Sequence, residues 1–399
     1  MQFGLVLLMV LVALNLRPAL ASLAPLLSRV QADTGLSAAA IGALTTMPVL
    51  CLGLFAPLAP WLSRRIGTER TLSLALLLLA VALMLRSGPG ILWLFLGTAL
   101  AGAAIGIGGT VLPVLVKRDL PRGADLMTGV YTMALCLGGA LGAGLSIPLA
   151  DLFGSWQLSL ASWSLLAFLA LCCWRLLAAH PWPQSNARSR ARVGTGLLRS
   201  PLAWQITLLM ASQSALAYIV FGWLPVLLQR RGLGEAEAGL LLGASVFVQL
   251  FAALAAPWLA RLGRDQRPAL LCALALVAAG FYCLLQGPAA LRWPGVVALG
   301  LGQGGSFSLA LALLVLRSAN PAVAGELSGM SQGFGYCLAA LGPLAVGLLL
   351  QFNVSLTGIW LALTAVVVLA MALALLAGRQ RVLDVDDTGC FVTREHRRG

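Results

Sequence analysis

Charged side chains are scarce in this sequence: lysine, arginine, aspartate and glutamate together make up only 10% of its 399 residues. Soluble domains carry about 25% charged residues, so this scarcity argues against a soluble enzyme or a soluble binding module. Histidine occurs twice, both times in a polar segment. What is present instead is apolar, at 60% of the chain. The composition therefore predicts a protein that lies mostly within a lipid bilayer.

Cysteine occurs eight times, but no two cysteines have the C-x-x-C spacing of a metal-binding or redox motif. Seven of the eight fall in apolar runs, where a free cysteine acts as a small buried apolar side chain. The sequence therefore predicts no metal centre, no disulfide framework and no cofactor.

Twelve apolar runs follow one another, and each is close to the length that crosses the roughly 30 Å hydrocarbon layer as a helix. Only helices and closed barrels satisfy the backbone in lipid, and continuous apolar runs exclude a barrel, whose strands alternate. The sequence therefore predicts an all-α membrane protein with twelve transmembrane helices. Their approximate bounds are 4–27, 37–60, 71–86, 91–115, 125–149, 157–178, 201–227, 238–259, 268–286, 294–316, 327–350 and 355–377.

The formal charge of +13 would suggest nucleic acid as the partner of a soluble protein. In a membrane protein, basic residues instead hold loops on the cytoplasmic side. With both termini inside, cytoplasmic segments hold 20 of the 26 basic residues and outer segments hold five. We therefore expect a multi-pass protein of the bacterial inner membrane with both termini in the cytoplasm, in contact with lipid and with no nucleic acid.

Three short motifs recur in the same order and at a nearly constant offset, which indicates two parallel six-helix halves. The matching segments are 59–62 with 256–259, 106–110 with 302–306, and 140–142 with 340–342. We predict an N-terminal half at 1–178, a cytoplasmic linker at 179–200, a C-terminal half at 201–377 and a cytoplasmic tail at 378–399. The tail is polar, and we expect it to be solvated and disordered.

One charged residue, Arg17, lies near the centre of an apolar run. A guanidinium at the bilayer midplane costs roughly 2.5–3.5 kcal/mol on insertion scales, so it normally faces the interior of a bundle. Every aspartate and glutamate lies in a loop, in the tail or at the end of a run, so none can pair with Arg17 at that depth. Two interpretations stay open. Arg17 anchors an anion or a strongly polar acceptor in a central cavity, or it bonds helix carbonyls and only fixes packing.

The absence of acids at mid-depth in the apolar runs also bears on what drives transport. Proton relays in transporters are commonly built from intramembrane aspartate, glutamate or histidine, and the apolar runs contain none at mid-depth. We therefore expect uniport, exchange or movement driven by the charge of the solute.

Few other polar side chains lie within the runs. Gln332 and Tyr336 share one helix face at a spacing of four, and Gln303 replaces the Ile107 of the first repeat. Taken singly, each polar residue is explained by an interhelical hydrogen bond worth about 0.6 kcal/mol. Taken as a set, several should line a cavity. The predicted substrate-binding residues are Arg17, Asn15, Gln213, Tyr218, Gln303, Gln332 and Tyr336.

Basic loops follow the second and eighth runs, and an acid begins the fifth and eleventh runs on the same side. We predict ion pairs between the halves that latch the cytoplasmic side while the protein is open outward. The alternative is plain topogenic charge, with surface pairs worth at most about 1 kcal/mol. The pairs that we predict are Glu326 with Arg64 or Arg65, and Asp125 with Arg261 or Arg264.

Residues 61–70 resemble the loop signature of major facilitator superfamily transporters, with Arg64 in place of the usual aspartate. Segments 15–18, 117–121, 300–305 and 339–343 are similar to the cyanate permease and 2-nitroimidazole transporter branch of that superfamily. The resemblance covers residues 1–377. It implies a small polar or anionic solute, such as cyanate or a nitroimidazole-like heterocycle, that is exposed alternately to either side.

We therefore expect a monomeric secondary active or facilitative transporter and no enzyme. A broad-specificity exporter of hydrophobic drugs is the nearest alternative, and it would have Arg17 turned into packing. A membrane-embedded transferase would need catalytic carboxylates near the membrane surface, where only a few scattered acids occur. A passive channel fits less well, because a two-half repeat is typical of rocking rather than of a fixed pore.

Overall fold

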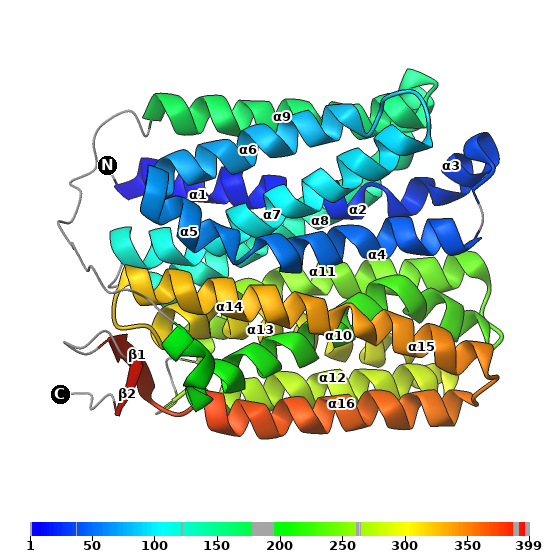
Figure 1. Ribbon diagram of the computed structural model, residues 1–399. Helices are drawn as coiled ribbons and strands as arrows, with labels where there is room; N and C mark the ends of the chain where they lie inside the picture. Colours follow the sequence, from blue (N-terminus) through cyan, green and yellow to red (C-terminus); the bar gives the residue numbers. More distant parts are fainter. Residues whose placement is uncertain are drawn as a thin grey trace.

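The computed structural model describes residues 2–36, 38–120, 123–177, 195–260, 263, 265–385 and 391–395 (Figure 1). Nearly all of them are helical, because a helix pairs its own backbone groups where lipid offers no partner. Up to residue 177 the elements are α1 (Gln2–Leu16), α2 (Pro18–Ala21), η1 (Ala24–Leu26), α3 (Leu27–Thr34), α4 (Ala38–Phe55), α5 (Leu58–Ile66), α6 (Thr68–Leu85), α7 (Ile91–Asp119), α8 (Ala124–Phe153) and α9 (Trp156–Leu177).

From residue 195 onward the elements are η3 (Thr195–Arg199), α10 (Pro201–Gln229), α11 (Glu235–Leu259), α12 (Arg267–Leu285), η4 (Ala289–Leu291), α13 (Arg292–Leu316), α14 (Pro321–Ala339), α15 (Leu341–Gln351), α16 (Leu356–Ala377), β1 (Arg381–Val385) and β2 (Phe391–Glu395). Residues 179–194 of the predicted linker lie outside the described residues. Below, N half and C half denote residues 1–178 and 201–377.

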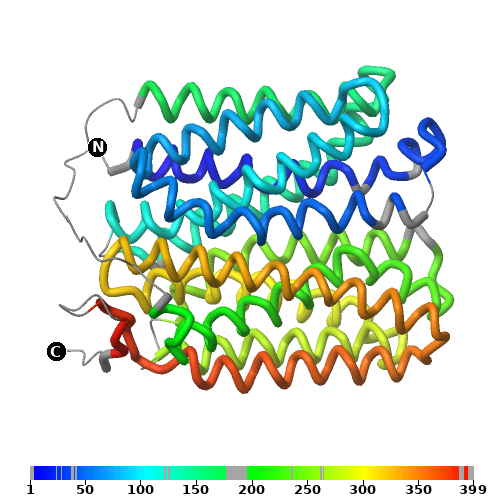
Figure 2. Tube along the Cα trace, viewed as in Figure 1, coloured from blue at the N-terminus to red at the C-terminus, as the bar shows by residue number. Residues whose placement is uncertain are grey.

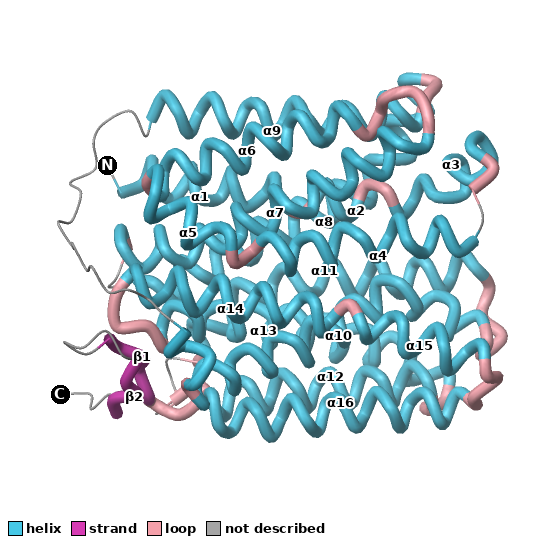
Figure 3. The backbone as a smooth tube through the Cα atoms, viewed as in Figure 1, coloured by secondary structure: helices cyan, strands magenta, loops and turns pink. Residues whose placement is uncertain are grey.

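Eleven helical stretches in the described ranges are long and apolar enough to cross a membrane. A twelfth is the pair α4 and α5, whose axes bend by 48° at a short break (Figure 3). Pro57 lies in this break and lacks the N–H group that would continue the helical hydrogen bonds. The prediction of an all-α membrane protein with twelve transmembrane helices is confirmed.

The N half and the C half lie side by side, in the upper and lower parts of the view (Figure 2). Helix α8 packs on α11, and α14 packs on both α4 and α7. α1 begins and α16 ends at one end of the bundle, which also carries α5 and the strands (left in Figure 1) and which we call the terminal end. α3 and the end of α15 lie at the opposite end.

Glycines bring the two halves together near the terminal end. A Cβ atom at Gly129 of α8 would lie 3.0 Å from the carbonyl oxygen of Leu254 on α11. On α14, a Cβ at Gly329 would lie 2.9 Å from the ring of Pro60. Toward the opposite end of α11, by contrast, Gly243 has nothing within 4 Å of the place of a Cβ. The close contacts that these glycines make between the halves are therefore concentrated at the terminal end.

The expectation that the tail is disordered is wrong for its described part. β1 pairs with β2 as an antiparallel hairpin. The Leu383 side chain is fully buried. The backbone N–H of Leu383 donates to the carbonyl of Arg317 at 2.8 Å, and its carbonyl accepts from the N–H of Ala319 at 2.9 Å. A polar overall composition concealed the buried Leu383, which gives the hairpin an apolar side chain to dock with.

Arg317 is the buried residue on which the hairpin docks, and only 4% of it is exposed. Its guanidinium donates to the carbonyl of Ala377 at 3.2 Å, to that of Gly378 at 2.9 Å, and to the side chain of Gln266. A cation here also compensates the negative end of α16. Burial lowers the pKa of Arg317 to about 10, and nearby Asp265 opposes the shift, so the side chain remains charged at neutral pH.

We expect Leu383→Ala to release the hairpin, because burial of a leucine side chain contributes about 1.5–3 kcal/mol. Hydrogen exchange of the backbone amides at Ala319 and Leu383 should then become at least about tenfold faster. Val392→Ala is the matched control, since this side chain in β2 is 36% exposed. Unchanged exchange at both amides in Leu383→Ala would contradict the docking.

Candidate functional site

A narrow cavity lies at the centre of the bundle, between the N half and the C half. The space open to the centre of a water molecule is about 30 Å³, which is room for about two or three waters. Residues from α1, α4, α7 and α8 line one side, and residues from α10, α13 and α14 line the other. The lining residues are Leu16, Arg17, Leu52, Ile105, Gly109, Leu112, Tyr131, Leu135, Tyr218, Phe307, Leu311, Gln332 and Tyr336.

Arg17 lies at a break between two helices. α1 ends at Leu16 and α2 begins at Pro18, which has no N–H to donate to the carbonyl of Leu14. The carbonyl of Arg17 itself accepts the first hydrogen bonds of α2. Interrupted helices near the bilayer midplane are typical of transporter binding sites. The proline thus places the one mid-membrane cation where the chain leaves regular helix.

Two glycines of α8 pack directly against the backbone at this break. A Cβ at Gly138 would overlap the carbonyl oxygen of Leu14, and a Cβ at Gly142 would lie 2.8 Å from the Cα of Pro18. Between them, Gly139 faces the Cβ of Arg17, at 3.7 Å from the place where its own Cβ would be. Only hydrogens fit in this slot, so the backbones of α1 and α8 approach each other closely.

The guanidinium of Arg17 is partly exposed and has no counter-charge. Its Cζ lies 4.8 Å from the ring centroid of Phe307, on α13 of the C half. A cation–π contact of this kind is worth about 0.5–2 kcal/mol. No hydrogen bond or ion pair joins the guanidinium to any residue that the structure describes, and no carboxylate is among the lining residues. The cavity is therefore positively charged and rich in donors.

Three other predicted site residues line the cavity with Arg17. The rings of Tyr218 and Tyr336 meet edge to face at 6.3 Å. Gln332 donates to the hydroxyl of Ser328 at 2.7 Å and, across the halves, to the carbonyl of Gly109 at 3.2 Å. The cavity thus has polar groups from both halves.

The other three predicted residues are buried but do not line the cavity. Asn15 donates to the carbonyl of Leu11 at 2.8 Å, within its own helix. Gln213 bonds the hydroxyl of the next residue at 2.6 Å. Gln303 donates to the carbonyl of Leu216 on α10 at 3.3 Å. Local and interhelical hydrogen bonds hold these three side chains away from the centre.

The sequence analysis missed Phe307 and Tyr131. Phe307 directly follows the second copy of the glycine-rich repeat, but an apolar residue in an apolar run gives no signal of its own. Tyr131 has a weak signal in retrospect: the chain holds only four tyrosines, and three of them, Tyr131, Tyr218 and Tyr336, line the cavity.

The structure describes one of the two predicted latch pairs between the halves. Arg64, at the terminal end of α5, forms an ion pair with Glu326 of α14 and so joins the two halves. Arg65 instead stacks on the ring of Trp61, with its Cζ 4.3 Å from the centroid. The side chain of Asp125, together with Arg261 and Arg264, lies outside the described residues.

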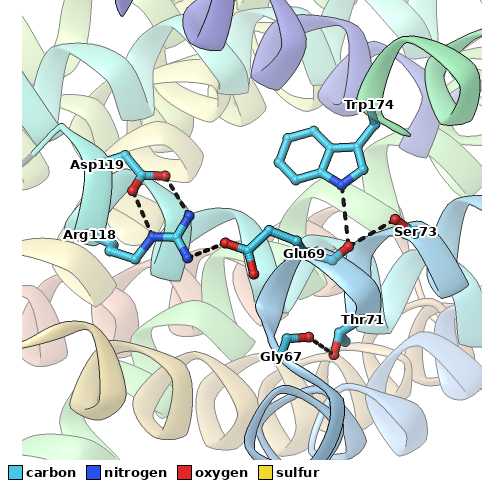
Figure 4. A network of polar contacts seen from close by, with 7 residues as sticks. All are labelled: Gly67, Glu69, Thr71, Ser73, Arg118, Asp119 and Trp174. Carbon is cyan, nitrogen blue, oxygen red and sulfur yellow. Dashed lines mark hydrogen bonds and ion pairs between the residues drawn. The ribbon is translucent and has the colours of Figure 1, made fainter. Parts of the chain in front are cut away.

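A polar network that the sequence analysis did not predict lies at the terminal end of the N half, and it includes residues of two of the segments that carry the family resemblance (Figure 4). Arg118 of α7 makes two hydrogen bonds to Asp119, at 2.6 and 3.0 Å, and one to Glu69 of α6 at 2.5 Å. Trp174 of α9 donates to the backbone carbonyl of Glu69 at 3.3 Å. Three helices of the N half are therefore tied together at this end.

The family model of the Major Facilitator Superfamily matches residues 5–343. The chain belongs to the major facilitator superfamily. It is 36% identical to the 2-nitroimidazole transporter of Escherichia coli (strain K12), over 93% of this chain and 94% of that protein. It is 33% identical to the cyanate transport protein CynX of the same organism, over 86% of this chain and 89% of that protein.

A solved structure of the proton:xylose symporter XylE, bound to 6-bromo-6-deoxy-D-glucose, shares the fold, with a TM-score of 0.76 over 94% of each chain and 13% sequence identity. The family resemblance read from the sequence is confirmed. The chain is thus a multi-pass membrane transporter of small solutes, and its relatives and fold are those of transporters rather than enzymes.

We expect Gly138→Ala to destabilise the protein, because the added methyl group would push α8 away from the break at Arg17. Overpacking of a tight contact costs about 1–3 kcal/mol, against about 1 kcal/mol gained in helix propensity. Gly144→Ala, on the same helix and with nothing within 4 Å, is the matched control and carries the propensity gain alone. The melting temperature in detergent should fall in Gly138→Ala and hold or rise in Gly144→Ala. Equal melting temperatures in the two variants would contradict the slot.

Proposed function

We propose that this protein moves a small polar or anionic solute, cyanate-like or nitroimidazole-like, across the bacterial inner membrane by alternating access, with Arg17 as the anchor. The observation that carries the proposal is the guanidinium of Arg17, which projects into the central cavity and pairs with no described carboxylate. The relatives named for 2-nitroimidazole and cyanate support the same class of solute.

The charge balance of the cavity favours an anion or a strong acceptor. An unpaired charge in a low-dielectric site is expensive, and a bound anion or nitro group would compensate it. Arginine holds its charge at every relevant pH and offers a planar fork of donors. A hydrophobic cation would find no carboxylate among the lining residues and would meet the guanidinium instead. This is why the drug-exporter alternative is less favoured.

The position of the site suits alternating access. Arg17 belongs to the N half, whereas Phe307, Tyr218 and Tyr336 belong to the C half. A solute between them contacts both halves at once, so its binding free energy can favour a different arrangement of the halves. Gln332 already bonds across the halves and would adjust with them.

The ion pairs differ between the two ends of the bundle. At the terminal end, Arg64 and Glu326 join the N half to the C half. At the opposite end, Arg29 pairs with Asp151 within the N half, and Arg292 pairs with Glu237 within the C half. With both termini in the cytoplasm, as we propose, this conformation is closed toward the cytoplasm and Arg64–Glu326 is its latch.

We expect Glu326→Gln to shift the protein toward the conformation that is open to the cytoplasm. Arg64 is half exposed, so its pair with Glu326 is worth at most about 1 kcal/mol, and the shift in population should be about two- to fivefold. Reaction of a cysteine placed at Ser328 with an impermeant maleimide from the cytoplasmic side reports the opening.

Glu237→Gln is the control, since it breaks an ion pair within one half at the opposite end. A double exchange, Arg64→Glu with Glu326→Arg, should return the reaction rate toward that of the wild type. If all three variants react like the wild type, the pair is topogenic charge and no latch.

We expect a solute that binds the cavity to lose its effect in Arg17→Ala. A ligand at 100 times its dissociation constant stabilises the fold by about 2.7 kcal/mol, which a thermal-shift assay resolves. Cyanate and 2-nitroimidazole should raise the melting temperature of the wild type and of Arg29→Ala, but not of Arg17→Ala. Arg17→Lys should retain part of the shift, because it keeps the charge without the planar fork.

The same variants test transport in proteoliposomes. Uptake of the stabilising solute should proceed in the wild type without an imposed proton gradient and fall to background in Arg17→Ala. Stabilisation by hydrophobic cations that survives in Arg17→Ala would favour the drug exporter and make Arg17 a packing residue.

A further inference from the structure

Tyr131 of α8 gives the cavity a hydroxyl group that makes no well-formed hydrogen bond. The residue lines the cavity together with Arg17, and its side chain is 1% exposed. Its Oη atom is buried, and its only side-chain contact of hydrogen-bond type among the described residues is with Thr128, one turn earlier on α8. That contact lacks the geometry of an ordinary hydrogen bond, and the Thr128 hydroxyl already donates to the carbonyl of Ala124. Five other buried side-chain N or O atoms in the described part of the chain also lack a partner, but none of their residues lines the cavity.

A buried hydroxyl without a well-formed hydrogen bond has a free-energy cost in this position. Leaving a buried donor unsatisfied costs about 1–3 kcal/mol, and the large majority of buried polar side-chain atoms in proteins are paired. A phenylalanine would fill the same space without that cost. The hydroxyl of Tyr131 is therefore explained best by a hydrogen-bond partner that binds transiently, and in this cavity that partner is the transported solute.

The geometry of α8 relates Tyr131 to Arg17. Gly138, which receives the helix break at Arg17, follows Tyr131 by seven residues, or about two helical turns on the same face. Tyr131 therefore faces the cavity about two helical turns closer to the terminal end than the break at Arg17. Both residues belong to the N half, so they keep their relative positions when the halves move against each other.

We propose that the hydroxyl of Tyr131 is the second donor to the solute and a determinant of specificity. This rests on the proposed function, because it concerns the same cavity. The solute places its charge or its strongest acceptor against Arg17 and a second acceptor atom against Oη of Tyr131. The site thereby selects solutes with two separate acceptor atoms, such as a linear two-ended anion or a nitro-substituted heterocycle. A one-centre anion leaves the hydroxyl unpaired.

Tyr131→Phe tests this, with sodium cyanate and 2-nitroimidazole as the probes and chloride as the one-centre anion. The dissociation constant of the probe that stabilises the wild type should rise about five- to fiftyfold, because one hydrogen bond to the solute is lost. The melting temperature without ligand should stay the same or rise, because an unsatisfied hydroxyl is removed. Any effect of chloride should be the same in both proteins. Tyr282→Phe is the matched control, since Tyr282 lies on α12 outside the cavity and is 49% exposed.

The results separate this inference from the proposed function. A dissociation constant that is unchanged in Tyr131→Phe, while Arg17→Ala abolishes binding, overturns the role of Tyr131 and leaves the anchor intact. Binding that survives in Arg17→Ala overturns the proposed anchor. A lower melting temperature of ligand-free Tyr131→Phe assigns the hydroxyl to a structural hydrogen bond and overturns the inference. If neither probe stabilises the wild type, the solute class itself is wrong and the inference falls with it.

Discussion

The cost of holding one positive charge in the middle of the bilayer is the constraint on which the centre of this structure depends. A guanidinium at this depth costs roughly 2.5–3.5 kcal/mol even on the mildest scale. The protein contains no carboxylate among the described lining residues to offset it. Instead, the charge borders a cavity and lies 4.8 Å from the ring centroid of Phe307. This compensation is weak, which is why we propose that an acceptor from outside completes it.

The local backbone follows from this constraint. Arg17 reaches the cavity because Pro18 interrupts the helix, and the interruption can pack only against a helix without side chains at the point of contact. Gly138 and Gly142 meet that requirement on α8. The same helix carries Tyr131 into the cavity. One helix therefore both packs against the break at Arg17 and carries Tyr131, so the relative placement of these two residues is rigid.

Much of this arrangement could be predicted from the sequence, and the exceptions have physical reasons. The twelve spans follow from their apolar runs, and the isolation of Arg17 follows from the positions of all acids. Tyr218, Gln332 and Tyr336 line the cavity, but helix periodicity does not say which buried amide finds a partner nearby. Gln303 bonds a carbonyl of α10 for that reason. Phe307 could not be found, because a ring that holds a cation looks like any core phenylalanine in the sequence.

The tail was misjudged because its role depends on a difference between the halves. Arg118 and Arg317 hold similar places, each at the end of the fourth span of its half. Arg118 is neutralised by Asp119 and Glu69. The residue after Arg317 is a serine, and the side-chain partner of Arg317 just before α12 is the uncharged Gln266, with Asp265 nearby but not bonded to it. The carbonyls at the end of α16 supply the missing acceptors, and Leu383 docks directly beside them. The buried cation of the C half is thus satisfied and covered by the chain's own C-terminal segment.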